Sequence, residues 1–203
     1  MFTSYGPPLP SIAPVFFLQG SDYEMGYQYG YQAAEYISFF KDNVWANMLR
    51  WGYTREEIES RLEAFEYYNQ KYFPEISENL RGMVDGATNA GYPMTYSDVL
   101  LIQCEWDVGV GDEPETVYPP VEEIEYPPKG CSNFAAWGRE TTDDCIVGGT
   151  SADAGEFRPQ GIICVFPDTG NNFISSAEIG LDARLLQSRF IMSWYHPQYL
   201  LKN

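Results

Sequence analysis

The chain contains 203 residues, 44% of them hydrophobic, and its formal net charge at pH 7 is −17. This length and apolar content favour one large folded domain or two small ones over global disorder. An acidic surface repels phosphate backbones, so nucleic acid is not an expected partner. No apolar run reaches the roughly 18 residues of a membrane span. The first 14 residues lack the basic start of a signal peptide, so the expected location is cytoplasmic.

The histidine and cysteine content limits the possible metal and redox sites. The chain has one histidine, His196, and four cysteines without a C-x-x-C pair. Zinc ribbons, multi-histidine zinc sites and thioredoxin-like sites are therefore excluded, and neither a metal nor a cofactor is expected. Cys104 and Cys164 lie in apolar runs and are expected to be buried as small hydrophobic side chains. Cys131 differs, because it follows Gly130 and a stretch rich in proline and glutamate.

The first elements in chain order are a strand and a helix. Residues 14–19 have the character of a short buried strand. Residues 21–22 can cap a helix that runs to about Phe40. Gly26 and Gly30 lie four residues apart on this helix, where each costs about 1 kcal/mol relative to alanine. We interpret them as points of close packing against a neighbouring element.

Two further helices follow. Thr54 and Glu57 form a capping box at the start of a segment with apolar residues at helical spacing, which ends near residue 72. Pro74 suits the first turn of the next helix, which is expected to end near Gly91. These elements make the first part of the chain helical.

The pattern divides the chain into three regions. The helical region covers 1–106, and its last piece is capped at Thr95 or Ser97. Residues 107–130 contain five prolines and seven carboxylates and are expected to form an exposed linker. Residues 131–203 are expected to be β-rich. The predicted strands, short and separated by turns, are 132–138, 145–150, 161–166 and 172–177.

A cysteine at the start of a strand, preceded by glycine and an acidic loop, suggests self-cleavage. If the Gly130–Cys131 peptide bond is cut, the Cys131 thiol lies beside its own α-amine. That amine has an unperturbed pKa of roughly 7.7–8.0, which suits a general base near neutral pH. Nucleophile and base then come from one residue, and no histidine is needed. The alternative is that Cys131 is an ordinary buried cysteine at a strand start.

Three blocks of the chain resemble one family. The block GCSNFAAWGRETTDDCIVGGTSADAG resembles the nucleophile strand, hairpin turn and second strand of N-terminal nucleophile hydrolases. The most similar type is the isopenicillin N acyltransferase-like family, whose relatives include choloylglycine hydrolases and acid ceramidase. FLQGSDYEMGYQYGYQAAEYI is similar to the helix that opens that family's precursors, and FPEISENLRGMVDGATNAGYPMTYSDVLLIQCEWD to its next helical block. The resemblance covers roughly residues 14–177, in order.

The resemblance implies an α+β chain of the αββα type that cleaves itself before Cys131. It also implies an amidohydrolase or acyltransferase acting on the carbon–nitrogen bond of a small acyl amide. Cys131 matches the family nucleophile, and Asp153 matches the aspartate that holds the new α-amine. The family often reads Gly-Arg-Asn-x-Asp, whereas this chain has Thr150 and Ser151 in place of the arginine and asparagine. We treat these two as candidate substrate-orienting residues, without the arginine's carboxylate clamp.

The length of the chain departs from the family. Its members supply an oxyanion-hole asparagine and most of their second sheet after residue 200, whereas this sequence ends at Asn203. Asn171 and Asn172 lie in a predicted turn and are poor substitutes. We therefore expect a missing C-terminal portion or a second chain to complete the fold. Two alternatives stay open: a non-catalytic member that binds an acyl ligand or a partner chain, and a fragment whose helical half is an interaction module.

Overall fold

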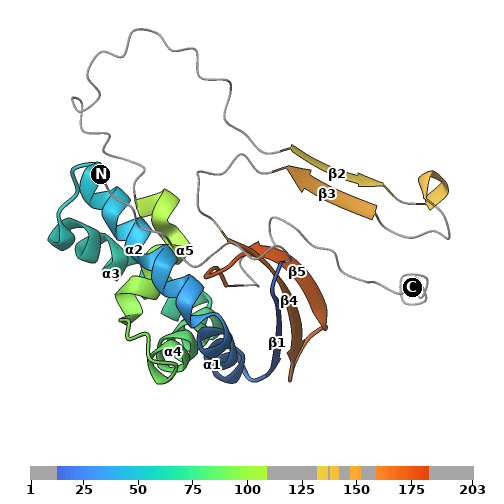
Figure 1. Ribbon diagram of the computed structural model, residues 1–203, viewed down its shortest axis with the longest axis horizontal. Helices are drawn as coiled ribbons and strands as arrows, with labels where there is room; N and C mark the ends of the chain where they lie inside the picture. The colour runs from blue at the N-terminus through green and yellow to red at the C-terminus, as the bar shows by residue number, and fades with distance from the viewer. Residues whose placement is uncertain (1–12, 109–131, 137, 142–146, 152–158, 183–203) are drawn as a thin grey trace, which may run out of the picture.

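The computed structural model describes residues 13–108, 132–136, 138–141, 147–151 and 159–182 (Figure 1). These residues form a mixed α+β structure with a helical N-terminal half and a small three-stranded sheet. The α+β prediction is confirmed at this level. The elements, in chain order, are β1 (Val15–Gly20), α1 (Asp22–Gln32), α2 (Ala34–Arg50), α3 (Arg55–Tyr72), α4 (Pro74–Asn89), α5 (Tyr96–Val108), β2 (Ser132–Ala136), the 3-10 helix η1 (Gly138–Glu140), β3 (Val147–Ser151), β4 (Gln160–Pro167) and β5 (Phe173–Glu178).

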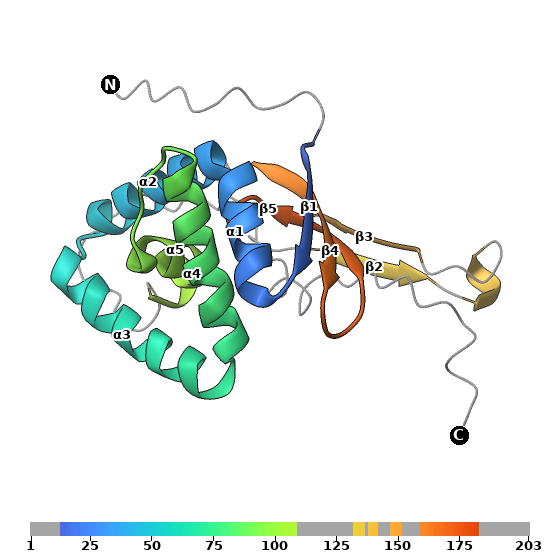
Figure 2. The same cartoon turned by 90° about the horizontal axis from the view of Figure 1, so that it is seen from below.

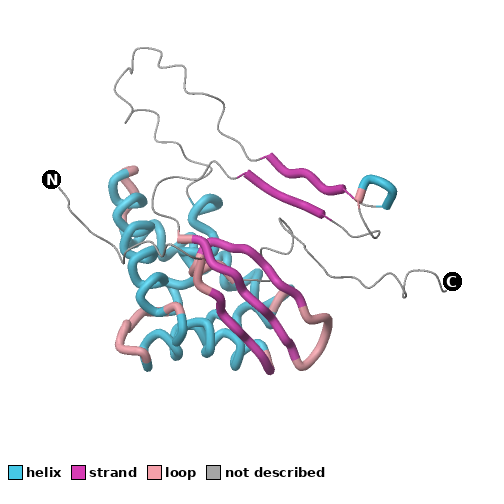
Figure 3. The backbone as a smooth tube through the Cα atoms, turned by 45° about the vertical axis from the view of Figure 1, so that its right-hand side comes forward, coloured by secondary structure: helices cyan, strands magenta, loops and turns pink. Residues whose placement is uncertain are grey.

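The three-stranded sheet has the order β1-β4-β5 and joins distant parts of the chain (Figure 3). β1 pairs parallel with β4, with Val15 opposite Ile162, and β4 pairs antiparallel with β5. Strands were predicted at 14–19, 161–166 and 172–177, and all three are confirmed. The parallel pairing was not part of the prediction, because it depends on a contact between segments about 140 residues apart. β2 and β3 form a separate antiparallel pair.

The prediction of a single helix that ends near Phe40 is wrong. The chain forms two helices, which meet at the buried Ala33. Ala33 leaves helical geometry (φ −104°, ψ 9°), while its N–H still donates to the Tyr29 carbonyl at 2.9 Å. The helical hydrogen bonds restart beyond this residue, where the Ile37 N–H donates to the Ala33 carbonyl at 3.0 Å, and the chain bends between the two helices. α2 continues to Arg50 because its apolar residues keep a helical spacing beyond Phe40 and bury one face.

The predicted helix starts agree with the structure. The Thr54 hydroxyl accepts from the Glu57 N–H, and the Glu57 carboxylate accepts from the Thr54 N–H at 2.7 Å. Pro74 occupies the first turn of α4. At the start of α5 the cap is Thr95, whose N–H donates to the Asp98 carboxylate at 2.8 Å. The hydroxyl and carboxylate therefore satisfy N–H groups that the first turn of a helix leaves unpaired.

Close packing of α1 on α4 confirms the interpretation of Gly26 and Gly30. A β-carbon on Gly26 would lie 2.0 Å from the Asn79 carbonyl oxygen, and one on Gly30 would lie 2.1 Å from the Met83 carbonyl oxygen. The contact is reciprocal, because Gly82 and Gly86 of α4 approach the backbone of α1 equally closely. Only glycine lets two helix backbones approach this closely.

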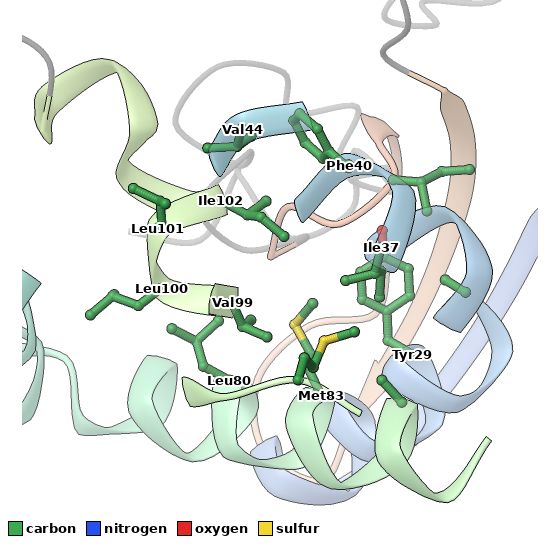
Figure 4. Packing of buried hydrophobic residues seen from close by; sticks show 14 of the residues in the cluster. Tyr29, Ile37, Phe40, Val44, Leu80, Met83, Val99, Leu100, Leu101 and Ile102 are labelled. Atoms are coloured by element: carbon green, nitrogen blue, oxygen red, sulfur yellow. The ribbon is translucent and has the colours of Figure 1, made fainter. Parts of the chain in front are cut away.

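The hydrophobic core lies between the helices and one face of the sheet (Figures 2 and 4). Phe16 and Leu18 of β1 point into it, while their neighbours Val15 and Phe17 point outward. The helices contribute fully buried side chains such as Tyr29, Ile37, Leu80, Met83, Leu101 and Ile102. No helix in the described part of the chain is both long and apolar enough to cross a membrane.

Candidate functional site

Only some of the predicted site residues are among the described residues. Gly130, Cys131 and Asp153 lie outside the described residues. Thr150 and Ser151 are the last two residues of β3. The strands predicted at 132–138 and 145–150 are confirmed within the described residues as β2 and β3, whereas residues 137, 145 and 146 lie outside them.

The register of the β2–β3 pair fixes the positions of Thr150 and Ser151 in the ladder. Ser151 lies opposite Ser132, and Thr150 lies opposite Asn133. Ser132 directly follows Cys131 in the sequence. Because the strands are antiparallel, the chain enters β2 and leaves β3 at the same end of the pair. The two candidate orienting residues are therefore next to the residues that follow the predicted nucleophile.

The two cysteines within the described residues are buried, as predicted. Cys104 lies on α5 and donates its thiol to the Leu100 carbonyl at 3.0 Å. Burial, reinforced by the nearby Asp107 and Glu105 carboxylates, raises the pKa of the Cys104 thiol to about 12. At neutral pH this thiol is therefore protonated and unreactive. Cys164 of β4 is 7% exposed. Neither thiol is exposed, as the thiol of a catalytic nucleophile has to be.

A buried polar network connects α1, α5 and the segment after β5. Tyr29 accepts a hydrogen bond from the Gly180 N–H at 2.9 Å. Gln103 donates to the Gly180 carbonyl at 2.8 Å and accepts from the Asp182 N–H at 2.7 Å. Burial raises the pKa of Tyr29, and the Asp182 carboxylate adds to the rise, so the hydroxyl is protonated at any physiological pH. The network attaches the chain beyond β5 to the helical layer.

This network was not among the predicted features, although the sequence contains a signal for it. Gln103 and Glu105 interrupt the apolar run VLLIQCEW. A polar side chain within such a run is expected to be buried and hydrogen-bonded. Glu105 is 7% exposed and Asp182 is 2% exposed. The described residues contain no group of three or more His, Cys, Asp or Glu side chains that could hold a metal ion.

The helical region extends slightly beyond its predicted end. Asp107 and Val108 were predicted to belong to the exposed linker, but they form the last turn of α5, and Val108 is fully buried. Arg61 of α3 donates to the Val108 carbonyl at 2.6 Å, which pairs a carbonyl that the helix end leaves free. The burial of Val108 explains why the helix continues past residue 106, because burying this apolar side chain stabilises the last turn despite the acidic residues around it. Residues 109–130 lie outside the described part of the chain.

The chain was compared with protein-family models and with known proteins. A search against protein-family models finds no match. The chain is 32% identical over 174 residues to a protein of Archaeoglobus fulgidus described as "Uncharacterized protein". The match covers 80% of this chain and 29% of the relative. The chain therefore spans less than a third of the length of the relative it matches.

Proposed function

We propose that this protein is a self-processing amidohydrolase or acyltransferase of the N-terminal nucleophile type, with Cys131 as its nucleophile. The observation that carries the proposal is the ladder between β2 and β3, in which Ser132 pairs with Ser151. Cys131 precedes Ser132, and Asp153 follows Ser151 by two residues. Because both chain ends leave the same end of the ladder, this register supports a site shared by Cys131 and Asp153.

The burial of the other cysteines supports the same choice of nucleophile. Cys104 and Cys164 are buried, and the pKa of the Cys104 thiol is far above neutral. Of the four cysteines, only Cys131 directly follows a glycine that can adopt the strained peptide geometry of an acyl shift. Cys145, in DDCIVGG, lacks such a neighbour.

Exposed apolar side chains on one face of the sheet support the αββα form of the fold. Val15, Phe17, Phe166 and Ile174 are between 44% and 61% exposed. The register of the three strands places these side chains on one face of the sheet. This face is opposite to the one that carries Phe16 and Leu18, so it points away from the helices. Such a face is typically covered by a second sheet about 10 Å away. In our proposal that second sheet completes the αββα sandwich, with a further portion of the protein or a second chain contributing to it.

The proposed chemistry has two stages. In the first, the Cys131 thiol attacks the Gly130 carbonyl carbon, the Gly130–Cys131 C–N bond breaks, and the acyl group moves to sulfur as the amine takes up the thiol proton. Water then hydrolyses the thioester, giving the Gly130 carboxylate and a free thiol. In the second, the same thiol attacks a substrate amide while the α-amine of Cys131 carries the proton to the leaving nitrogen.

The other proposed roles follow from this scheme. Asp153 holds the α-amine by a charge-assisted hydrogen bond. Thr150 and Ser151, at the end of β3, orient the acyl amide. Water as acceptor gives hydrolysis, and a second amine gives acyl transfer. The Cys131 thiol is the nucleophile and the Cys131 α-amine is the base.

Intact-mass measurement tests the proposal directly. The unchanged chain is expected to yield two pieces that end and begin at residues 130 and 131, whereas Cys131→Ala stays whole. Cys145→Ala is the matched control and is expected to cleave normally. If Cys131→Ala still separates at this bond, an outside protease makes the cut. If the chain stays intact and shows no turnover of small acyl amides, the non-catalytic alternative replaces the proposal.

A further inference from the structure

β1 lies at the edge of its sheet and has an aggregation-prone sequence. The described sheet order is β1-β4-β5, so the described strands pair with β1 on one side only. The strand reads VFFLQG and carries no charge, and Phe17 is 61% exposed. A free strand edge offers unpaired N–H and C=O groups to other chains. Uncharged segments of high β-propensity are those that pair most readily in this way.

The hydrogen bonds at both ends of β1 identify the groups on its free edge. The Pro14 carbonyl accepts from the Ile162 N–H, and the Gly20 carbonyl accepts from the Asp168 N–H. Even-numbered residues of this segment therefore direct their backbone groups toward β4. Because backbone groups alternate along a strand, the odd-numbered residues direct theirs toward the free edge.

Two glutamine side chains of α1 bind these edge groups. The Gln28 Oε1 accepts from the Gln19 N–H at 3.0 Å, and the Gln28 Nε2 donates to the Gln19 carbonyl at 2.8 Å. The Gln32 Nε2 donates to the Phe17 carbonyl at 3.1 Å and to the Gln28 carbonyl at 3.0 Å. A primary amide, like a peptide group, has both a donor and an acceptor. The Gln28 side chain therefore pairs the Gln19 N–H and carbonyl as the backbone of a neighbouring strand would.

The spacing of helix and strand explains why two glutamines four residues apart fit. Ser21 joins β1 to α1, and α1 runs back beside the strand (Figure 2). Four residues of helix advance about 6 Å. Two residues of strand advance about 6.6 Å. Gln28 and Gln32 therefore lie level with Gln19 and Phe17.

We propose that Gln28 and Gln32 form an edge cap that prevents β1 from pairing with β1 of a second copy of this chain. The cap occupies the main-chain groups that such pairing requires, while the exposed Phe17 would add apolar contact between the copies. Without the cap, a second copy is the partner that this edge fits, because two identical uncharged strands do not repel each other. The inference does not depend on the proposed function.

Sedimentation equilibrium and hydrogen exchange on the Gln28→Ala/Gln32→Ala variant test the proposal. All chains carry Cys131→Ala, so that self-cleavage does not change the species measured. The double variant is expected to self-associate at least tenfold more strongly than the chain with both glutamines. At low concentration its Gln19 amide exchanges faster, and it becomes protected again as the concentration rises. Such protection is specific to pairing through this edge.

Two further variants keep the test decisive. Gln70→Ala removes a glutamine from α3 that contacts Glu66, and it is expected to leave association unchanged. Adding Phe17→Lys to the double variant is expected to abolish the extra association, because an edge lysine opposes strand pairing. The proposal is overturned if the folded double variant associates no more strongly, or if Phe17→Lys leaves the association in place. Should the double variant not fold, Gln32→Ala alone is decisive, and an unchanged association constant overturns the proposal.

Discussion

Gly26 of α1 lies directly against the backbone carbonyl of Asn79 of α4, with no space between them for a side chain. A β-carbon at Gly26 would be 2.0 Å from that oxygen, far inside van der Waals contact. The Asn79 side chain also bonds to this helix, donating to the Asp22 carbonyl at 3.1 Å. The first helix after β1 is therefore fixed along α4 by backbone contact, and its glutamines are fixed along the strand.

Gly26→Ala is expected to destabilise the protein, although alanine favours an isolated helix by about 1 kcal/mol. The added methyl group forces α1 and α4 apart, and overpacking of this kind costs about 1–3 kcal/mol. Urea unfolding measures the change in free energy. Ala64→Gly, at an exposed position on α3, measures the difference in helix propensity between alanine and glycine without any packing effect. A Gly26→Ala chain more stable than the parent would contradict the close contact.

Tyr29→Phe tests the buried network around Gly180. The substitution keeps the ring but removes the acceptor of the Gly180 N–H, and a buried donor left unpaired costs about 1–3 kcal/mol. Thermal or urea unfolding gives the loss of stability, and hydrogen exchange at Gly180 is expected to accelerate. Tyr31→Phe, on an exposed ring of the same helix, is the control and is expected to change little. Equal effects of the two variants would mean that the Tyr29 hydroxyl carries no structural role.

Local signals in the sequence were sufficient to predict most of the elements. The capping box at Thr54 and Glu57 and the proline at position 74 depend on neighbours within one helical turn. The spacing of Gly26 and Gly30 also predicted close packing correctly. What it could not identify was the partner helix, because the reciprocal glycines of α4 lie more than 50 residues away.

Features that depend on distant contacts were missed. The parallel pairing of β1 with β4 brings together residues 15 and 162, and nothing in either segment specifies the other. The bend at Ala33 was missed because alanine normally continues a helix. For the candidate site, the sequence predicted the β2–β3 pair that contains Thr150 and Ser151. The network of Gln103 was overlooked because its partners, Gly180 and Asp182, are remote in sequence.

The capping box of α3 predicts a pH dependence of stability. Hydrogen bonds from the Thr54 N–H and hydroxyl lower the pKa of the Glu57 carboxyl below its ordinary value. In the unfolded chain the pKa of a glutamate carboxyl is about 4.3. The stabilising contribution is therefore complete above the unfolded pKa and is lost as the pH falls through the lower folded pKa.

Glu57→Gln, which keeps a neutral hydrogen-bonding group, is expected to be less stable than the parent at pH 6. The difference should narrow as the pH falls below the unfolded pKa, because the parent then also carries a neutral group. Urea unfolding at a series of pH values measures it. Glu63→Gln, an exposed position on the same helix, is the control. A difference that stays constant with pH would exclude a role for the Glu57 charge.

Thiol reactivity is expected to separate the buried cysteines from Cys131. In the folded chain, Cys104 and Cys164 should resist iodoacetamide and react only in denaturant. Raising the pH from 7 to 9 should hardly increase labelling of Cys104, because the pKa of its thiol is about 12. Peptide mapping by mass spectrometry gives the labelling of each cysteine. Rapid labelling of Cys104 in the folded chain would contradict its burial.

Hydroxylamine is expected to trap the thioester of the proposed self-cleavage. Hydroxylamine attacks the Gly130 acyl group on the Cys131 sulfur, so the N-terminal piece ends in a hydroxamate, heavier than the carboxylic acid by one NH group. The reaction should be faster than hydrolysis and independent of protein concentration, because thiol and carbonyl belong to one chain. Cys131→Ser should process more slowly, and Cys145→Ser at the parent rate. Intact mass distinguishes the products. Cleavage that gives only the carboxylic acid in excess hydroxylamine, at a rate that rises with added protein, would mean that no thioester forms and that the bond is cut between molecules.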